Sequence, residues 1–213
     1  MGDSTFAPVW EELNRRQAVV FLHGSQIPAS MPSPDASLGV PITEVPNQTF
    51  KAASHLVVTG QRKKYPNVKI ILAHAGGALP MLASRVAVLS SYMGCRLSPE
   101  EILDGFKTFW YDVALSGDEP SVRALEAFVG IERMLFGTDY PGIFSQIPSV
   151  RNLMGIIAVS TGMADWFNRH LKLYYQHNLT AIDNILKTNA TRLFSTDSDI
   201  VDKYNRAVVN ANT

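Results

Sequence analysis

The sequence lacks several features that would place the protein in other classes. Cys95 is the only cysteine, which excludes an internal disulfide and a cysteine-built zinc site and favours a reducing compartment such as the cytoplasm. Charge of neither sign is in excess, since 19 Lys and Arg residues balance 19 Asp and Glu residues, so neither nucleic acid nor an anionic membrane is indicated as a partner. There is also no apolar run long enough to span a membrane and no signal-like amino terminus. We therefore expect a soluble, cytoplasmic protein that acts on a small molecule.

The residues that are present predict an α/β domain. Short β-branched segments alternate with longer segments of helical periodicity, which is the pattern of βα units around a parallel sheet. Hydrophobic residues make up 46% of the 213 positions, enough for one sizeable core. We predict one domain over residues 1–195 and a polar tail over 196–213. The predicted strands are 18–23, 68–74, 108–113 and 134–137, and the predicted helices include 6–16, 47–64, 80–92, one from Ser98, 120–129 and most of the chain beyond Pro148.

A proline-rich segment separates the first predicted strand from the next helix. It contains Pro28, Pro32, Pro34, Pro41 and Pro46. Such a segment is too long for an ordinary connection between a strand and a helix. It is interpreted either as an active-site loop or lid, or as a surface insertion without a function, and the sequence favours neither.

Three titratable residues stand at or just past predicted strand ends: His23, His74 and Asp139. Catalytic residues of parallel α/β folds gather there because the loops after the strands converge. A single buried histidine is more often structural, but three such residues at three strand ends favour a site. Imidazole nitrogens and a carboxylate suit a divalent metal. Asp139 could instead transfer a proton and His74 could polarise a substrate oxygen, and spacing does not assign these roles.

The other candidate residues carry weaker signals. Asp112 falls inside the third predicted strand, where it could support a site residue or simply cap or hydrogen-bond within the core. His55, His170 and His177 fall inside predicted helices, and we expect all three to be structural or solvated.

The strand ends also resemble those of a known family. The segments VVFLH (19–23), IILAHAGGALP (70–80) and LFGTDYP (135–141) resemble the fifth, sixth and eighth strand motifs of the amidohydrolase-related decarboxylases. These enzymes include aminocarboxymuconate semialdehyde, γ-resorcylate and 6-methylsalicylate decarboxylases. The resemblance covers nearly the whole chain. It implies a TIM-barrel-type (β/α) fold, of which the chain would hold the carboxy-terminal half, about four βα units, followed by carboxy-terminal helices.

The resemblance implies roles for four residues. His23 would be a metal ligand, Asp139 a metal ligand that also delivers a proton, and His74 a catalytic histidine near the substrate. Arg85 matches a position that is often arginine in the family, where it would meet a carboxylate or a neighbouring subunit, although it could equally pair on a helix surface. The implied cofactor is a divalent metal, with zinc expected before manganese. The implied substrate is a small aromatic carboxylic acid, with 6-methylsalicylate as the first candidate, and we expect a homo-oligomer.

One departure from the family leaves other functions open. The family's first strand normally carries histidine or glutamate, then histidine two residues later, and the chain has no such pair, so the resemblance implies that the amino-terminal part is missing. A metal-dependent hydrolase of the same superfamily would use similar strand-end ligands. A truncated inactive or regulatory chain is the second alternative. A flavodoxin-like doubly wound domain is a further alternative for the fold, disfavoured because no glycine-rich turn follows the first strand.

Overall fold

The sheet has four parallel strands. A computed structural model describes residues 1–25, 35, 38–139 and 153–195, and all structural statements below concern these residues. The strands lie side by side in chain order: β1 (Val19–Leu22), β2 (Lys69–Leu72), β3 (Trp110–Asp112) and β4 (Met134–Leu135). A doubly wound sheet would show a reversal in this order, which is absent among the described strands. The strand order therefore excludes the flavodoxin-like alternative and agrees with part of a (β/α) barrel.

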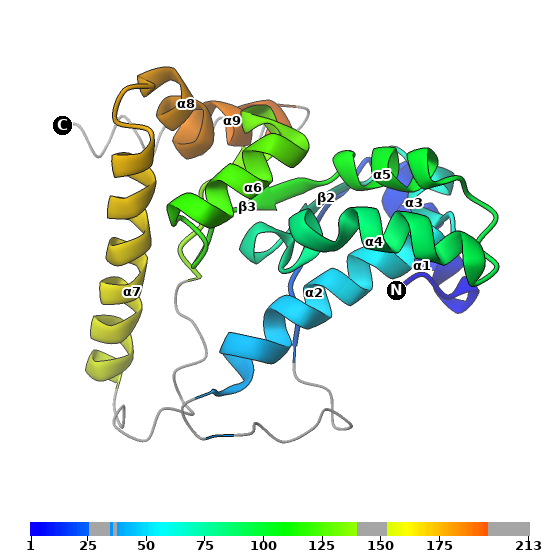
Figure 1. Ribbon diagram of the computed structural model, residues 1–213, viewed down its shortest axis with the longest axis horizontal. Coiled ribbons are helices and arrows are strands. Elements are labelled where there is room, and N and C mark those ends of the chain that lie inside the picture. The colour runs from blue at the N-terminus through cyan, green and yellow to red at the C-terminus, as the bar shows by residue number, and fades with distance from the viewer. Residues whose placement is uncertain (26–34, 36–37, 140–152, 196–213) are drawn as a thin grey trace.

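Helices connect the strands and follow the last one (Figure 1). Ser98 and Glu101 form a capping box at the start of one helix, and Asn178 caps another by accepting a hydrogen bond from the Ala181 amide. The helices are α1 (Ala7–Arg15), α2 (Val40–Val58), α3 (Gln61–Lys64), α4 (Leu79–Tyr92), α5 (Pro99–Lys107), α6 (Glu119–Val129), α7 (Leu153–Tyr174), α8 (Leu179–Asp183) and α9 (Asn189–Phe194), with 3-10 turns η1 (Ser4–Phe6), η2 (His74–Gly76) and η3 (Ile131–Arg133) and a π-helical segment η5 (Asn184–Thr188).

The largest correction to the predicted elements concerns α2. This helix begins at Val40, not at residue 47, so Pro41 and Pro46 are helical and are not part of a loop. Pro41 occupies the first turn, where an amide proton has no partner within the helix in any case. Pro46 lies inside the helix, where buried contacts of the flanking residues outweigh the lost hydrogen bond. Residues 26–34 and 36–37 of the proline-rich segment lie outside the described residues. The tail over 196–213 also lies outside them.

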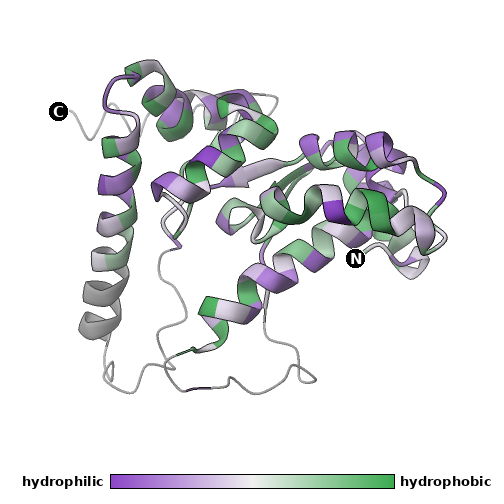
Figure 2. Ribbon diagram, in the orientation of Figure 1, coloured by the Kyte–Doolittle hydropathy of each residue, from purple (hydrophilic) through white to green (hydrophobic). Residues whose placement is uncertain are grey.

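The two faces of the sheet pack differently because side chains alternate along each strand. One face, which we call the outer face, packs against α1, α2, α4, α5 and α6 in the main hydrophobic core, through residues such as Ile70, Leu72 and Tyr111. Hydrophobic and hydrophilic residues are both present along these helices (Figure 2), and α4 exposes apolar side chains such as those of Met81 and Tyr92. The opposite, inner face forms a small cluster in which Ile71, Trp110 and Leu135 pack against Leu193 of α9.

The described helices cover the inner face only in part. Its β1 side chain Phe21 is 54% exposed, although it lies in the middle of a strand. The carboxyl ends of the strands meet beside this open face, so they place the residues that follow them around a shared hollow. No helix among the described residues has the length and apolar character needed to cross a membrane.

Candidate metal centre

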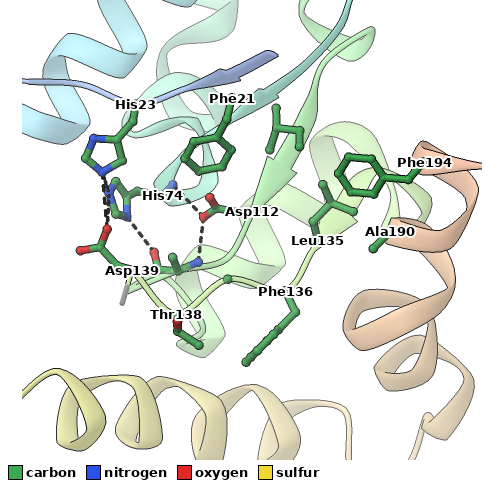
Figure 3. Close-up of a pocket in the computed structure, with 13 residues that line it drawn as sticks. Phe21, His23, His74, Asp112, Leu135, Phe136, Thr138, Asp139, Ala190 and Phe194 are labelled. Atoms are coloured by element: carbon green, nitrogen blue, oxygen red, sulfur yellow. Dashed lines mark hydrogen bonds and ion pairs between the residues drawn. The ribbon is translucent and has the colours of Figure 1, made fainter. Parts of the chain in front are cut away.

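The three residues predicted from strand ends come together in the structure. His23 follows β1, His74 follows β2 and Asp139 follows β4, and the three side chains point toward one another (Figure 3). The Nε2 atoms of the two histidines are 2.9 Å apart. The Asp139 Oδ1 atom is 3.5 Å from the His23 Nε2 atom and 3.8 Å from the His74 Nε2 atom. Among the described residues, these three form a group whose ligand atoms could hold a metal ion.

Backbone carbonyls fix which nitrogen of each ring faces the centre. The Nδ1 atom of His23 lies 2.6 Å from the Gly24 carbonyl oxygen, and the Nδ1 atom of His74 lies 3.0 Å from that of Ala114. A carbonyl oxygen only accepts, so each Nδ1 carries the proton and donates it. In a neutral ring, the Nε2 atom is then left with a free lone pair. Metal-binding histidines are commonly held in this way.

The donor set fits a divalent cation. Two lone pairs that face each other at 2.9 Å repel unless a cation or a proton lies between them. Two ligand atoms, each about 2.1 Å from one ion, lie about 3.0 to 3.4 Å apart at angles between 90° and tetrahedral. The histidine separation lies close to this range, and the Asp139 distances lie slightly above it. The three residues therefore supply two nitrogens and one oxygen, which leaves room for water or a substrate.

Neighbouring groups and burial shift the pKa values of His23 and Asp112 at the centre. The carboxylate of Asp139, helped by the Gly24 carbonyl, raises the pKa of the partly exposed His23 imidazole, while partial burial opposes this shift. Burial raises the pKa of Asp112, against the effect of two backbone amides that donate to its carboxylate. The centre is thus a pair of imidazoles between two carboxyl groups, an arrangement that attracts cations.

The backbone at the centre is held in an uncommon conformation. His74 and Ala75 have φ values of 55° and 54°, and Asp139 has a φ of 60°. Left-handed conformations in residues other than glycine cost free energy and collect at functional sites. The turn after His74 is completed by Gly77, which has a φ of 64° and where a Cβ atom would overlap the Pro46 carbonyl of α2. This is why the Gly-Gly pair follows His74, and why α2 can pack over the end of β2.

A cavity of about 690 Å³ opens beside the centre. Its volume falls in the range of small-molecule sites. One end carries the three candidate ligands and Asp112, and the rest is largely apolar (Figure 3). The apolar part is lined by Phe21, Ile71, Ala114, Leu135, Phe136, Gly137, Ala190 and Phe194, with Thr138 beside them.

Sequence reasoning found the titratable residues of the site but not its apolar wall. Phe21 could have been found, because a residue two positions before His23 in a strand shares its face. Phe194 could not have been found, because the sequence does not show that α9 packs against the inner face of the sheet. Arg85 is exposed on α4 and is not among the cavity residues, so its predicted role stays untested. His55 and His177 are exposed, as predicted.

Comparison with known proteins identifies relatives with the same fold. The amidohydrolase family model (Amidohydro_2) matches residues 2–196. A decarboxylase of Aspergillus niger, yanB, is 38% identical over 149 residues, which cover 66% of this chain and 40% of the relative. The 6-methylsalicylic acid decarboxylase of Penicillium expansum is 38% identical over 143 residues, which cover 66% of this chain and 44% of the relative. The chain thus spans less than half the length of these two relatives.

A solved structure confirms the architecture. The dihydroxybenzoic acid decarboxylase of Polaromonas sp. JS666, crystallised with manganese and the inhibitor 2-nitroresorcinol, has a TM-score of 0.67 to this chain at 23% sequence identity. The alignment covers 91% of this chain and 55% of that one. The predicted TIM-barrel-type fold is therefore confirmed, and four βα units with carboxy-terminal helices are what the chain contributes to it. Because the family model matches almost all of the described sequence, the chain belongs to the amidohydrolase family.

Proposed function

We propose that the protein is a metal-dependent carboxy-lyase that removes carbon dioxide from a small aromatic carboxylic acid, with 6-methylsalicylate as the first candidate substrate. The observation that carries this proposal is the cluster of His23, His74 and Asp139 at one end of a cavity with apolar walls. An aromatic acid is complementary to such a cavity with a bound metal: its anionic group fits the metal, and its flat apolar ring fits the apolar walls. The identity to fungal 6-methylsalicylic acid decarboxylases supports this choice of substrate.

The residues would divide the work by position. His23 and Asp139 would hold a divalent metal, which supplies positive charge for the carboxylate and hydroxyl oxygens of the substrate. The Nε2 lone pair of His74 would accept a hydrogen bond from the hydroxyl group of the substrate. Asp139 would take up a proton from solvent, deliver it to the ring carbon that carries the carboxylate, and return to its ionised form. The bond between that carbon and the carboxylate then breaks, carbon dioxide leaves, and the electron pair of the broken bond restores the aromatic ring.

The metal that we propose is zinc, with manganese as the competing candidate. An imidazole nitrogen and a carboxylate oxygen, the proposed ligands from His23 and Asp139, are acceptable to both ions. The manganese in the Polaromonas structure supports the second candidate. Loading the metal-free chain with each ion separately and comparing the bound stoichiometry would decide between them.

We also propose that the protein works in the cytoplasm as a homo-oligomer. A single free cysteine supports a reducing compartment. Among the described residues, one edge of β1 has no strand partner, and this edge and the exposed Phe21 support association, because unpaired strand edges and apolar faces are usually covered. Exposed Arg85 of α4 would reach a substrate carboxylate only in a neighbouring subunit, which is the role we propose for it.

The test is carbon dioxide release by the purified full chain, loaded with zinc or manganese and given 6-methylsalicylate. Release should require the metal, and the His74→Gln and Asp139→Asn variants should lose about 10²-fold or more in rate. His177→Gln, which changes an exposed histidine, is the matched control and should retain the rate. An aryl lactone, assayed in parallel, tests the hydrolase alternative. Lactone opening without carbon dioxide release would contradict the proposal, and so would a metal-loaded chain that does neither.

A further inference from the structure

Asp112 is a buried carboxylate beside the centre. It does not belong to the group of three residues that could hold a metal ion. It ends β3, is 4% exposed and lines the polar end of the cavity. Its Oδ1 atom accepts two backbone hydrogen bonds, from the His74 amide at 3.0 Å and from the Ala114 amide at 2.9 Å (Figure 3). A buried carboxylate is retained only where such partners satisfy it.

These two bonds connect Asp112 to the backbone of His74 and to Ala114, the residue to which the His74 ring donates its proton. The first fixes the backbone of His74 itself, where φ is 55°. The second fixes Ala114, whose carbonyl oxygen accepts the proton of His74 Nδ1 at 3.0 Å. The Asp112 Oδ1 atom therefore fixes the backbone of His74, from which the imidazole extends. It also fixes Ala114, whose carbonyl accepts the imidazole proton.

We infer that Asp112 is a positioning residue that holds His74 in the tautomer with its proton on Nδ1, so that the Nε2 lone pair faces His23 and Asp139. Asp112 acts through the backbone amides of His74 and Ala114. Without it, the Ala114 carbonyl would no longer be fixed in front of Nδ1, and the ring could turn or carry its proton on Nε2. The consequence for catalysis rests on the proposed function, but the tautomer of His74 does not.

The experiment reads the tautomer directly. The full chain, labelled with ¹⁵N-histidine and kept with a chelator to remove metal, is examined by long-range ¹H–¹⁵N correlation, and the His74 signals are assigned with a His74→Gln sample. The variants are Asp112→Ala, which removes the acceptor, and Asp112→Asn, whose amide oxygen can still accept both backbone protons. Asp104→Ala is the matched control, because Asp104 is an exposed carboxylate on α5.

In the unaltered chain, the inference predicts one His74 tautomer, with the proton on Nδ1. Asp112→Ala should lose this single state, while Asp112→Asn and Asp104→Ala should keep it. A folded Asp112→Ala variant with an unchanged His74 spectrum would overturn the inference, and so would an unaltered chain with the proton on Nε2. A carboxylate that only braced the fold would lower thermal stability without changing the tautomer.

A second measurement covers the case in which Asp112→Ala does not fold. In the unaltered chain, couplings across hydrogen bonds should connect the His74 and Ala114 amides to the side-chain carboxyl carbon of Asp112. If either coupling is missing, the inference is wrong, and if both are present together with the Nδ1 proton, it stands. Failure of the chain to bind metal or release carbon dioxide would count against the proposed function alone, because both readouts here are made without metal.

Discussion

At the scale of single residues, the site depends on backbone conformations that few side chains tolerate. Gly77 has a positive φ, and a Cβ atom there would overlap the Pro46 carbonyl of α2. Gly60 also has a positive φ of 75°, but nothing lies within 4 Å of the place where its Cβ atom would stand. The two glycines therefore separate the cost of the backbone conformation from the cost of close packing.

We predict that Gly77→Ala lowers the free energy of unfolding by about 3 kcal/mol or more, because strain and overlap add. Gly60→Ala should cost only about 1 to 2 kcal/mol, from the left-handed conformation alone. Urea unfolding of both variants measures the difference. Equal losses would mean that α2 does not pack over the turn after His74 as described.

The raised pKa of His23 predicts how metal binding depends on pH. A protonated imidazolium has no lone pair at Nε2, so protons compete with the metal, and a raised pKa extends this competition above the ordinary value of about 6.5. Bound metal should therefore fall as pH drops through the raised pKa. In the metal-free chain the sign is opposite: the shift stabilises the fold fully below about pH 6.5, and this contribution is lost as pH rises through the raised pKa.

Equilibrium dialysis across this pH range, with metal measured on both sides, checks the prediction. The same titration on His177→Gln is the control, because His177 is exposed and remote from the centre. Metal binding that does not change between about pH 5 and 8 would contradict the role of a histidine ligand.

The titratable residues of the site were predictable for a physical reason, and their supports were not. His23, His74 and Asp139 follow segments whose β-branched residues predict buried strands, so their convergence follows from the parallel sheet. Asp112 could be interpreted either as a support for a site residue or as a capping or core hydrogen-bonding residue. The sequence does not separate these roles, because an aspartate in any strand can accept hydrogen bonds from backbone amides. The carbonyl of Ala114, which orients His74, leaves no trace in the sequence, because every residue has a carbonyl.

At the scale of elements, η5 and α9 form hydrogen bonds along the edge of β4 that does not pair with β3. The Phe136 amide donates to the Ile185 carbonyl in η5, and Asn189 Nδ2 donates to the carbonyls of Ile131 and Met134. These bonds satisfy edge groups of β4 that would otherwise be free to pair with another strand. They also anchor the stretch that leads from β4 to Asp139.

We predict that Asn189→Ala lowers the free energy of unfolding by about 2 to 4 kcal/mol, because the buried carbonyl of Met134 and the partly buried carbonyl of Ile131 lose their donor. Asn178→Ala is the matched control, since Asn178 only caps α8, and its loss should cost about 1 kcal/mol. Thermal unfolding of the two variants checks the order. A smaller loss for Asn189→Ala than for Asn178→Ala would contradict the closure of the β4 edge.

The elements themselves were predicted in kind and order but not in extent. The four strands are all shorter than predicted. At their carboxyl ends, β pairing stops where the chain turns into the site, and β3 also begins two residues later than predicted. The start of α2 was missed because Pro41 and Pro46 were interpreted as loop residues. Proline disfavours a helix interior on average, but the buried Val45 and Thr49 show that tertiary packing prevails here.

At the scale of the whole molecule, the two edges of the sheet differ. The β4 edge is closed within the chain, whereas β1 pairs only with β2 among the described residues. Phe21 on β1 is exposed, and its side chain forms one wall of the cavity. The proposed self-association should therefore use the β1 side of the molecule.

We predict that the chain, whose mass is 23.4 kDa, sediments as a dimer or larger species, and that Phe21→Lys shifts it toward the monomer. A charge at an open edge opposes strand pairing and apolar contact. Leu179→Lys, which changes an exposed leucine at the start of α8, is the control and should leave the mass unchanged. A monomer in the unaltered chain would show that the open face is not a contact between copies.

The most direct test of the central claim is the metal content of the purified full chain, measured by elemental analysis beside its His23→Ala, Asp139→Ala and His55→Ala variants. The account predicts close to one divalent metal ion per chain in the unaltered protein and in the exposed-residue control His55→Ala, and its loss in the other two. Metal that persists in both His23→Ala and Asp139→Ala, or a parent chain that binds none when zinc or manganese is supplied, would contradict it.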